Sequence, residues 1–90
     1  MPQSTIQDYF DRLSDSKVNY TAKEGLVRGL GEYFTSPNAK VTTIGVNNTP
    51  VADMTVKDFV ETLRTTNQRY LFLSGNKDGD LYNTIKVRAN

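Results

Sequence analysis

The sequence RYLFLSGNKDGDLYNTIKVRAN, residues 69–90, decides the fold of this chain. Two runs rich in aromatic and aliphatic residues flank a cluster of Ser, Gly, Asn and Asp, which is the pattern of a β-hairpin. We expect its turn at residues 76–80. The helical segments that precede it have apolar faces that need a sheet to pack against, and this hairpin would supply most of that sheet.

Three segments before the hairpin have the periodicity of amphipathic helices. The first covers residues 4–14, and its apolar residues recur at one helical face. Each segment is expected to begin at a capping-box pair, in which a side chain bonds the backbone N–H of a residue three positions away. The three pairs are Ser4 with Gln7, Thr21 with Glu24, and Thr55 with Asp58.

The rest of the chain supplies the remaining strands. The β-branched residues 40–46 predict a strand, and residues 51–54 predict a short edge strand after Pro50. The sequence therefore predicts a single α+β domain over residues 1–90, either whole or cut from a longer chain. In it, N-terminal helices and one further helix pack on a small curved antiparallel sheet that ends in the hairpin.

The first strand of the hairpin is apolar on both faces. Tyr70 and Phe72 would point to one side, and Leu71 and Leu73 to the other. A strand of this kind is covered on both sides. Helices would cover one, and a partner chain, a ligand or further sequence would cover the other. With strict alternation in the second strand, the predicted interaction surface comprises Tyr70, Phe72, Tyr82, Thr84, Lys86 and Arg88.

Composition excludes several kinds of chemistry. Lys and Arg number 11 and Asp and Glu 10, so the net charge of +1 does not favour nucleic acid as a partner. The chain has no Cys and no His, which removes the thiolate nucleophile and the commonest general base and metal ligand. We therefore assign no catalytic residue, no metal site and no cofactor, and do not expect an enzyme. No segment would insert into a membrane, so we expect a soluble protein. The sequence leaves its compartment open, with the cytoplasm favoured.

Two weaker patterns are interpreted as structural. The loop at residues 76–80 places oxygen-bearing side chains close together, but an EF-hand needs Gly at its sixth position and Glu at its twelfth. Here Gly79 is fourth and Val87 is twelfth. A set of basic residues near Tyr70 and Tyr82 could bind single-stranded nucleic acid, although a solvated face explains it better: Arg64, Arg69, Lys86 and Arg88.

The pattern of elements resembles the nuclear transport factor 2-like superfamily. Residues 6–13, IQDYFDRL, resemble that family's first helix. A second helix leads to Tyr33-Phe34, and residues 39–44, AKVTTI, follow where the family has its first strand. Residues 56–63 resemble the next helix, and the hairpin the start of its long sheet. The resemblance implies a cone-shaped α+β domain around a pocket, in a family of isomerases, dehydratases, transport adaptors and accessory domains, often dimeric through the sheet. This chain stops two strands early and carries over no catalytic residue.

Three functional hypotheses follow. The first is a non-catalytic binding or oligomerisation domain that binds a protein partner, or itself, through the hairpin face. The second is a small-molecule pocket protein or an isomerase- or dehydratase-like enzyme of the same superfamily, with Tyr9, Asp11 and Tyr82 as candidate pocket residues. The third is a phage or bacterial inhibitor that acts by binding a protein target.

Overall fold

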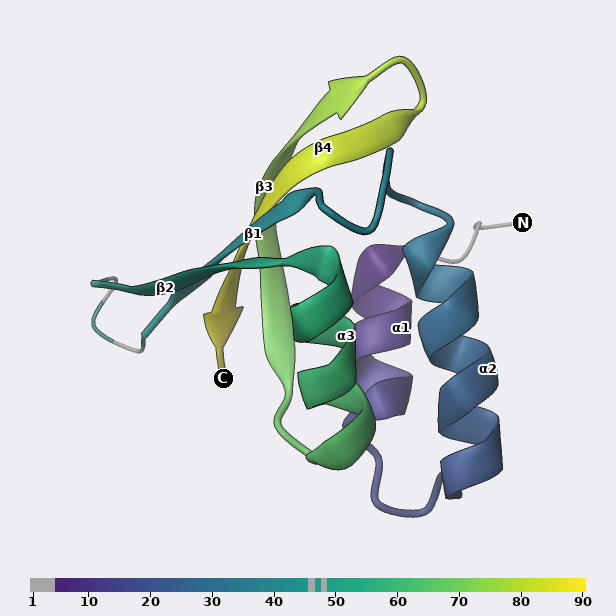
Figure 1. Cartoon of the computed structure of the whole chain (residues 1–90). Helices are drawn as coiled ribbons and strands as arrows, with labels where there is room; N and C mark the ends of the chain where they lie inside the picture. The colour runs from purple at the N-terminus through teal and green to yellow at the C-terminus, as the bar shows by residue number, and fades with distance from the viewer. Residues whose placement is uncertain (1–4, 46, 48) are drawn as a thin grey trace.

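The computed structural model describes residues 5–45, 47 and 49–90. Three helices lie on one side of a four-stranded sheet, and the long hairpin curves beyond them (Figure 1). This confirms the predicted α+β fold and its terminal hairpin. In chain order the elements are α1 (Ile6–Leu13), α2 (Tyr20–Gly31), β1 (Lys40–Ile44), β2 (Pro50–Thr55), α3 (Val56–Thr65), β3 (Tyr70–Asp78) and β4 (Leu81–Ala89).

The sheet is mixed, whereas the sequence predicted an antiparallel one. Its strand order is β2-β1-β4-β3, and β4 lies parallel to β1 while the other two pairs are antiparallel. The chain leaves β2 through α3 and enters the sheet again at its far edge. The last strand then fills the central position beside β1, in the same direction.

The observed strands begin or end at other residues than the sequence predicted. β1 ends at Ile44, and Val46, which the sequence placed in this strand, lies outside the described residues. β2 is an edge strand as predicted, but it includes Pro50, which pairs with Ile44 at an irregularity. β3 continues to Asp78, so the expected turn at residues 76–80 narrows to a two-residue connection. Gly79 in that connection has φ +69°, a conformation that favours glycine.

The first two helices begin at other caps than the sequence predicted. In α1 the Asp8 N–H donates to the Thr5 hydroxyl at 3.2 Å, and the Asp8 carboxylate accepts from the Thr5 N–H at 3.0 Å. Ser4, the predicted cap, lies outside the described residues. In α2 the cap is Asn19, whose side chain accepts from the Ala22 N–H at 2.8 Å. The prediction of a cap at Thr21 is therefore wrong.

The third helix begins at Thr55 as predicted, because its hydroxyl accepts from the Asp58 N–H at 3.2 Å. The apolar faces of all three helices meet the sheet in one core. Phe10 of α1 lies at its centre, with Phe59 of α3 and Tyr70 of β3 in edge-on contact with its ring. The buried apolar residues are Ile6, Phe10, Leu13, Leu30, Phe34, Ala39, Val41, Val56, Phe59, Leu63, Ile85 and Val87.

An irregularity in β4 changes which residues face the helices. Asn76 pairs with Thr84, but the next residue, Lys77, pairs with Tyr82, so Asn83 is an extra residue in β4. A Cβ atom on Gly75 would lie 2.7 Å from the Tyr82 ring and near the Ile85 side chain, so these two side chains share one face. The strict alternation predicted for this strand is therefore wrong, and Tyr82 points toward the helices.

A buried lysine joins α2 to the end of α3. The side chain of Lys23 is 7% exposed, and its ammonium group donates to the Asn67 side-chain oxygen at 2.8 Å and to the Thr66 carbonyl at 3.5 Å. Thr66 is the C-cap of α3. A cation at this position also interacts favourably with the helix dipole.

We expect Lys23→Met to lower the free energy of unfolding by about 1–3 kcal/mol, because the end of α3 loses a charged hydrogen-bond donor. Urea denaturation monitored by circular dichroism measures this loss. Lys57→Met, at an exposed position of α3, is the matched control and should change stability by less than about 0.5 kcal/mol. Equal losses in the two variants would show that the buried hydrogen bonds contribute nothing.

Candidate ligand-binding groove

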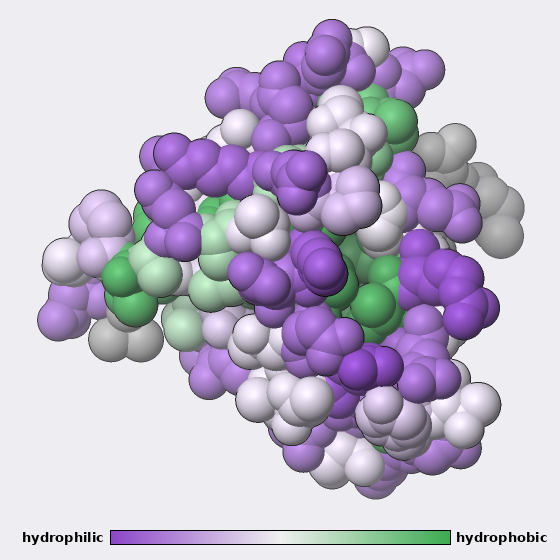
Figure 2. Space-filling model, viewed as in Figure 1, coloured by the Kyte–Doolittle hydropathy of each residue, from purple (hydrophilic) through white to green (hydrophobic). Residues whose placement is uncertain are grey.

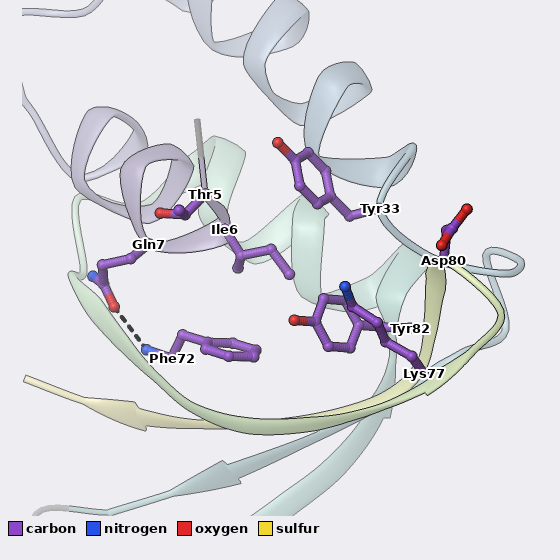
Figure 3. Close-up of a pocket in the computed structure, with 8 residues that line it drawn as sticks. All are labelled: Thr5, Ile6, Gln7, Tyr33, Phe72, Lys77, Asp80 and Tyr82. Carbon is purple, nitrogen blue, oxygen red and sulfur yellow. Dashed lines mark hydrogen bonds between the residues drawn. The ribbon is translucent and has the colours of Figure 1, made fainter. Parts of the chain in front are cut away.

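A groove of about 640 Å³ lies between the start of α1, the segment after α2 and the curved hairpin (Figure 3). Three structural units therefore meet at it, and they are far apart in the sequence. Both apolar and polar side chains line its wall. The lining residues are Thr5, Ile6, Gln7, Tyr33, Phe72, Lys77, Asp80 and Tyr82.

The side-chain amide of Gln7 fixes α1 to the edge of β3. Its oxygen accepts from the Phe72 N–H at 2.8 Å (Figure 3). Its nitrogen donates to the Tyr70 carbonyl at 3.0 Å. The amide thus donates one hydrogen bond to the edge of β3 and accepts one from it, as the backbone of a neighbouring strand would. This contact fixes the backbone from which the Phe72 ring reaches the groove.

The backbone of Tyr82 is held in a similar way by the segment after α2. Its N–H donates to the Tyr33 carbonyl at 2.8 Å, and its carbonyl accepts from the Thr35 N–H at 2.9 Å. Phe34 forms an isolated parallel bridge with Tyr82. These bonds place Tyr33 and Tyr82 side by side, and they occur where the extra residue of β4 turns the Tyr82 side chain inward.

Aromatic rings form most of the apolar wall. The rings of Phe72 and Tyr82 lie 5.6 Å apart at 61°, and Phe34 supports Tyr82 from behind at 6.3 Å. Tyr33 packs edge-on against Tyr9 at 5.5 Å. Gly75 leaves the space in which the Tyr82 ring lies across β3. Rings held by one another in this way form a preorganised surface.

The polar groups of the groove come from the start of α1, from the hairpin and from Tyr33. The Lys77 ammonium lies over the Tyr82 ring, 5.1 Å from its centroid, which is a cation–π contact. Burial raises the pKa of the Tyr33 hydroxyl, and its neighbours Tyr9 and Asp8 raise it further. Tyr33 is therefore a neutral phenol at physiological pH.

The structure divides the predicted interaction surface between the two faces of the sheet. Its three aromatic members point toward the helices, where Tyr70 packs on the core and Phe72 and Tyr82 line the groove. Since Ile85 and Val87 are buried in the core, the residues that alternate with them face outward. The outward-facing members are Thr84, Lys86 and Arg88.

The predicted pocket pair, Tyr9 and Asp11, is not brought together in this groove. Tyr9 lines an adjoining hollow of about 510 Å³, which shares Tyr33 and Asp80 with the groove. Asp11 lines neither the groove nor this hollow. Its carboxylate accepts from the Gln7 amide at 3.0 Å and from the Arg69 guanidinium at 2.9 Å. Asp11 therefore positions Gln7, whose side chain bonds the edge of β3.

Sequence reasoning missed Gln7, Tyr33 and Lys77 as groove residues. It used Gln7 in a helix cap and Lys77 in a turn, and it named Tyr33 in the family resemblance. The usable signal in the sequence was that the first hairpin strand is apolar on both faces, which predicts that Phe72 is covered by another element or by a ligand. Nothing local indicated that the Gln7 side chain meets a strand 65 residues away.

The contacts of Asp11 lower its pKa. Burial, the largest single influence, works to raise the pKa, and the hydrogen bonds from Gln7 and Arg69 with the charge of Arg69 outweigh it. A carboxylate with a lowered pKa in the folded state stabilises the fold above its unfolded pKa, and that stability is lost as the pH falls through the folded pKa.

We therefore expect Asp11→Asn to be less stable than the wild type at pH 7 by about 0.5 kcal/mol, a small value because the pair is half exposed. The difference should begin to shrink as the pH falls below the ordinary carboxyl pKa of about 4 and vanish once it is below the lowered pKa of folded Asp11. Urea denaturation at a series of pH values measures it. A difference that stays constant down to pH 2 would contradict the assignment.

The basic residues noted in the sequence do not form one free cluster. Arg64 pairs with Glu24 at 3.2 Å and with Glu61 at 2.9 Å, and Arg69 pairs with Asp11. Figure 2 shows hydrophilic atoms over most of this view, with apolar atoms gathered between the hairpin and the helices and over the β1–β2 end. Within the described residues there is no group of three or more metal-ligating side chains and no helix long and apolar enough to cross a membrane.

Comparison with known proteins adds no relative to this description. No family model, no curated protein and no solved structure matches the chain. The geometry of the groove is thus the basis for assigning a function.

Proposed function

We propose that this chain is a non-catalytic binding domain whose groove binds a small molecule. The observation that carries the proposal is the groove of about 640 Å³ between the hairpin and the helices. Its volume lies within the range of about 300–1,000 Å³ that ligand pockets occupy, and aromatic side chains of this kind are common in their walls. The absence of His and Cys from the sequence favours binding over catalysis.

The aromatic residues first assigned to a protein-binding face support this proposal in a new way. Phe72 and Tyr82 lie between the sheet and the helices, where a small ligand fits and a folded partner does not. The resemblance to the nuclear transport factor 2-like superfamily points the same way, since that family encloses its pocket between helices and a bent sheet. We propose that the chain is a compact relative of that family, on the support of its element order and curved hairpin.

The direct test uses an uncharged molecule of suitable size, 3-phenylpropionamide, titrated into isotope-labelled protein and monitored by NMR. We expect shifts concentrated at the backbone amides of Phe72, Lys77 and Tyr82. The variant Phe72→Ala should weaken binding at least about tenfold, because an aromatic wall is removed. Shifts that are absent up to the solubility limit, or spread evenly over the surface, would refute the proposal.

A matched control lies next to Phe72 in the same strand. Leu71 pairs with Arg88 on the outer face, so Leu71→Ala removes apolar contacts of similar kind without touching the groove. It should leave the affinity for 3-phenylpropionamide unchanged. Spectra of each variant without ligand show whether its fold is retained.

Self-association through the sheet is a second candidate, because the edge of β2 is available. β2 pairs with β1 on one side and is the edge of the sheet in the described part of the chain. Val51 in this strand is 69% exposed. An exposed edge strand with an apolar residue is suited to antiparallel pairing with a second copy.

This candidate predicts that the wild type scatters light as a dimer at high micromolar concentration and that Val51→Lys is a monomer. A lysine on an edge strand opposes pairing. The control is Leu81→Lys, at a 38% exposed position near the hairpin turn, which should stay dimeric. A wild type that is monomeric over the whole concentration range would exclude the candidate.

A further inference from the structure

We infer that the groove selects small organic carboxylates with an apolar body, the carboxylate being held by Lys77 and Tyr82. This inference rests on the proposed function and names its ligand class. It starts from two hydrogen-bond donors, the ammonium group of Lys77 and the hydroxyl of Tyr82. Both belong to residues that line the groove.

These two donors are available to a ligand. Within the described residues, Lys77 has no carboxylate partner and the Tyr82 hydroxyl makes no hydrogen bond; the Lys77 ammonium has only the Tyr82 ring beneath it. Figure 3 shows the hydroxyl directed into the space between Ile6 and Phe72, with the ammonium above the same ring. A positive charge and a phenol donor therefore converge beside an apolar wall.

A carboxylate matches this pair of donors. Charge-assisted hydrogen bonds from an ammonium or a hydroxyl to a carboxylate oxygen are short and strong. The side chains of Ile6, Phe72 and Tyr33 surround the adjacent space, so the rest of the ligand should be apolar. One ring with a short chain fits the volume of the groove.

A phosphate group fits this groove less well. Phosphates are commonly held by the free N–H groups at a helix N-terminus, and α1 begins at the groove. There, however, the capping box already uses the Asp8 N–H, and it places the negatively charged Asp8 carboxylate at this end of the helix, where it repels a phosphate. Lys77 supplies one positive charge, and Asp80 lines the rim on the side away from the Tyr82 hydroxyl (Figure 3), so a doubly charged anion is disfavoured.

The test compares two molecules of nearly the same shape, 3-phenylpropionate and 3-phenylpropionamide, in NMR titrations of the full chain at pH 7. We expect the carboxylate to bind about tenfold tighter or more, as a charge-assisted hydrogen bond predicts. Lys77→Met should abolish this preference. Asp80→Asn should increase it, because a like charge at the rim is removed.

The matched control is Lys86→Met, since Lys86 is an exposed lysine of the same hairpin on the outer face. It should retain the full preference for the carboxylate. A general effect of protein charge would instead reduce the preference equally in Lys77→Met and Lys86→Met, and that result would overturn the inference.

Two further outcomes separate this inference from the proposal beneath it. If the carboxylate and the amide shift the Phe72 and Tyr82 amides with equal affinity, the inference is overturned, but the proposed function as a binding domain stands. Binding of neither molecule would overturn both. Inorganic phosphate, titrated as a third ligand, would overturn the inference if it shifted the same amides at lower concentration than 3-phenylpropionate.

Discussion

Replacing Phe10 by alanine should lower the free energy of unfolding by about 3–5 kcal/mol, the range for truncating a buried Phe. Phe10 is fully buried. Its ring meets Phe59 at 5.8 Å and Tyr70 at 6.5 Å, both edge-on. One side chain thus joins α1, α3 and β3. Its removal leaves a cavity that these three elements cannot fill by moving together.

A loss of this size is a large part of the total stability of about 5–15 kcal/mol that a domain of this kind has. Urea denaturation monitored by circular dichroism should show a mainly unfolded or strongly destabilised variant. Phe10→Leu keeps most of the volume and should lose less. Val51→Ala, at an exposed site, should change stability by less than about 0.5 kcal/mol. A Phe10→Ala variant within 1 kcal/mol of the wild type would contradict this account of the core.

Gly75→Val should both destabilise the fold, by about 1–3 kcal/mol from overpacking, and narrow the groove. A Cβ atom at this position would lie 2.7 Å from two atoms of the Tyr82 ring and 3.1 Å from the Ile85 methyl group. Ile85 is fully buried and cannot move aside. The Tyr82 ring must then rotate away from β3, toward the groove between Phe72 and Ile6.

The same denaturation experiment, with NMR shifts of the Tyr82 ring, tests both parts of this prediction. Affinity for 3-phenylpropionamide should fall together with stability. Gly25 provides a control of opposite sign, because a Cβ there meets no atom within 4 Å. Gly25→Ala should stabilise α2 by about 0.5–1 kcal/mol, the usual gain for alanine over glycine within a helix. If Gly75→Val were as stable as the wild type, the close approach of Tyr82 to β3 would be refuted.

Two of the aromatic residues that line the groove had already been singled out in the sequence. Phe72 and Tyr82 were named as functional aromatics because they lie in a hairpin whose first strand is apolar on both faces. The sequence assigned them to a surface for a protein partner. The structure turns them inward, and the outer face keeps Thr84, Lys86 and Arg88. The sequence therefore named Phe72 and Tyr82 but did not place them in the groove that they line.

The sequence by itself determined the order of helices and strands, the apolar face of each helix, the hairpin at the end of the chain and the cap at Thr55. These features depend on spacing and turn chemistry within about ten residues. The tertiary structure alone decided the parallel pairing of β1 with β4, the extra residue in β4 that turns Tyr82 inward, and the bond of Gln7 to the edge of β3. Each of these depends on hydrogen bonds between segments distant in the sequence, so local preference cannot choose among them, and together they form the groove.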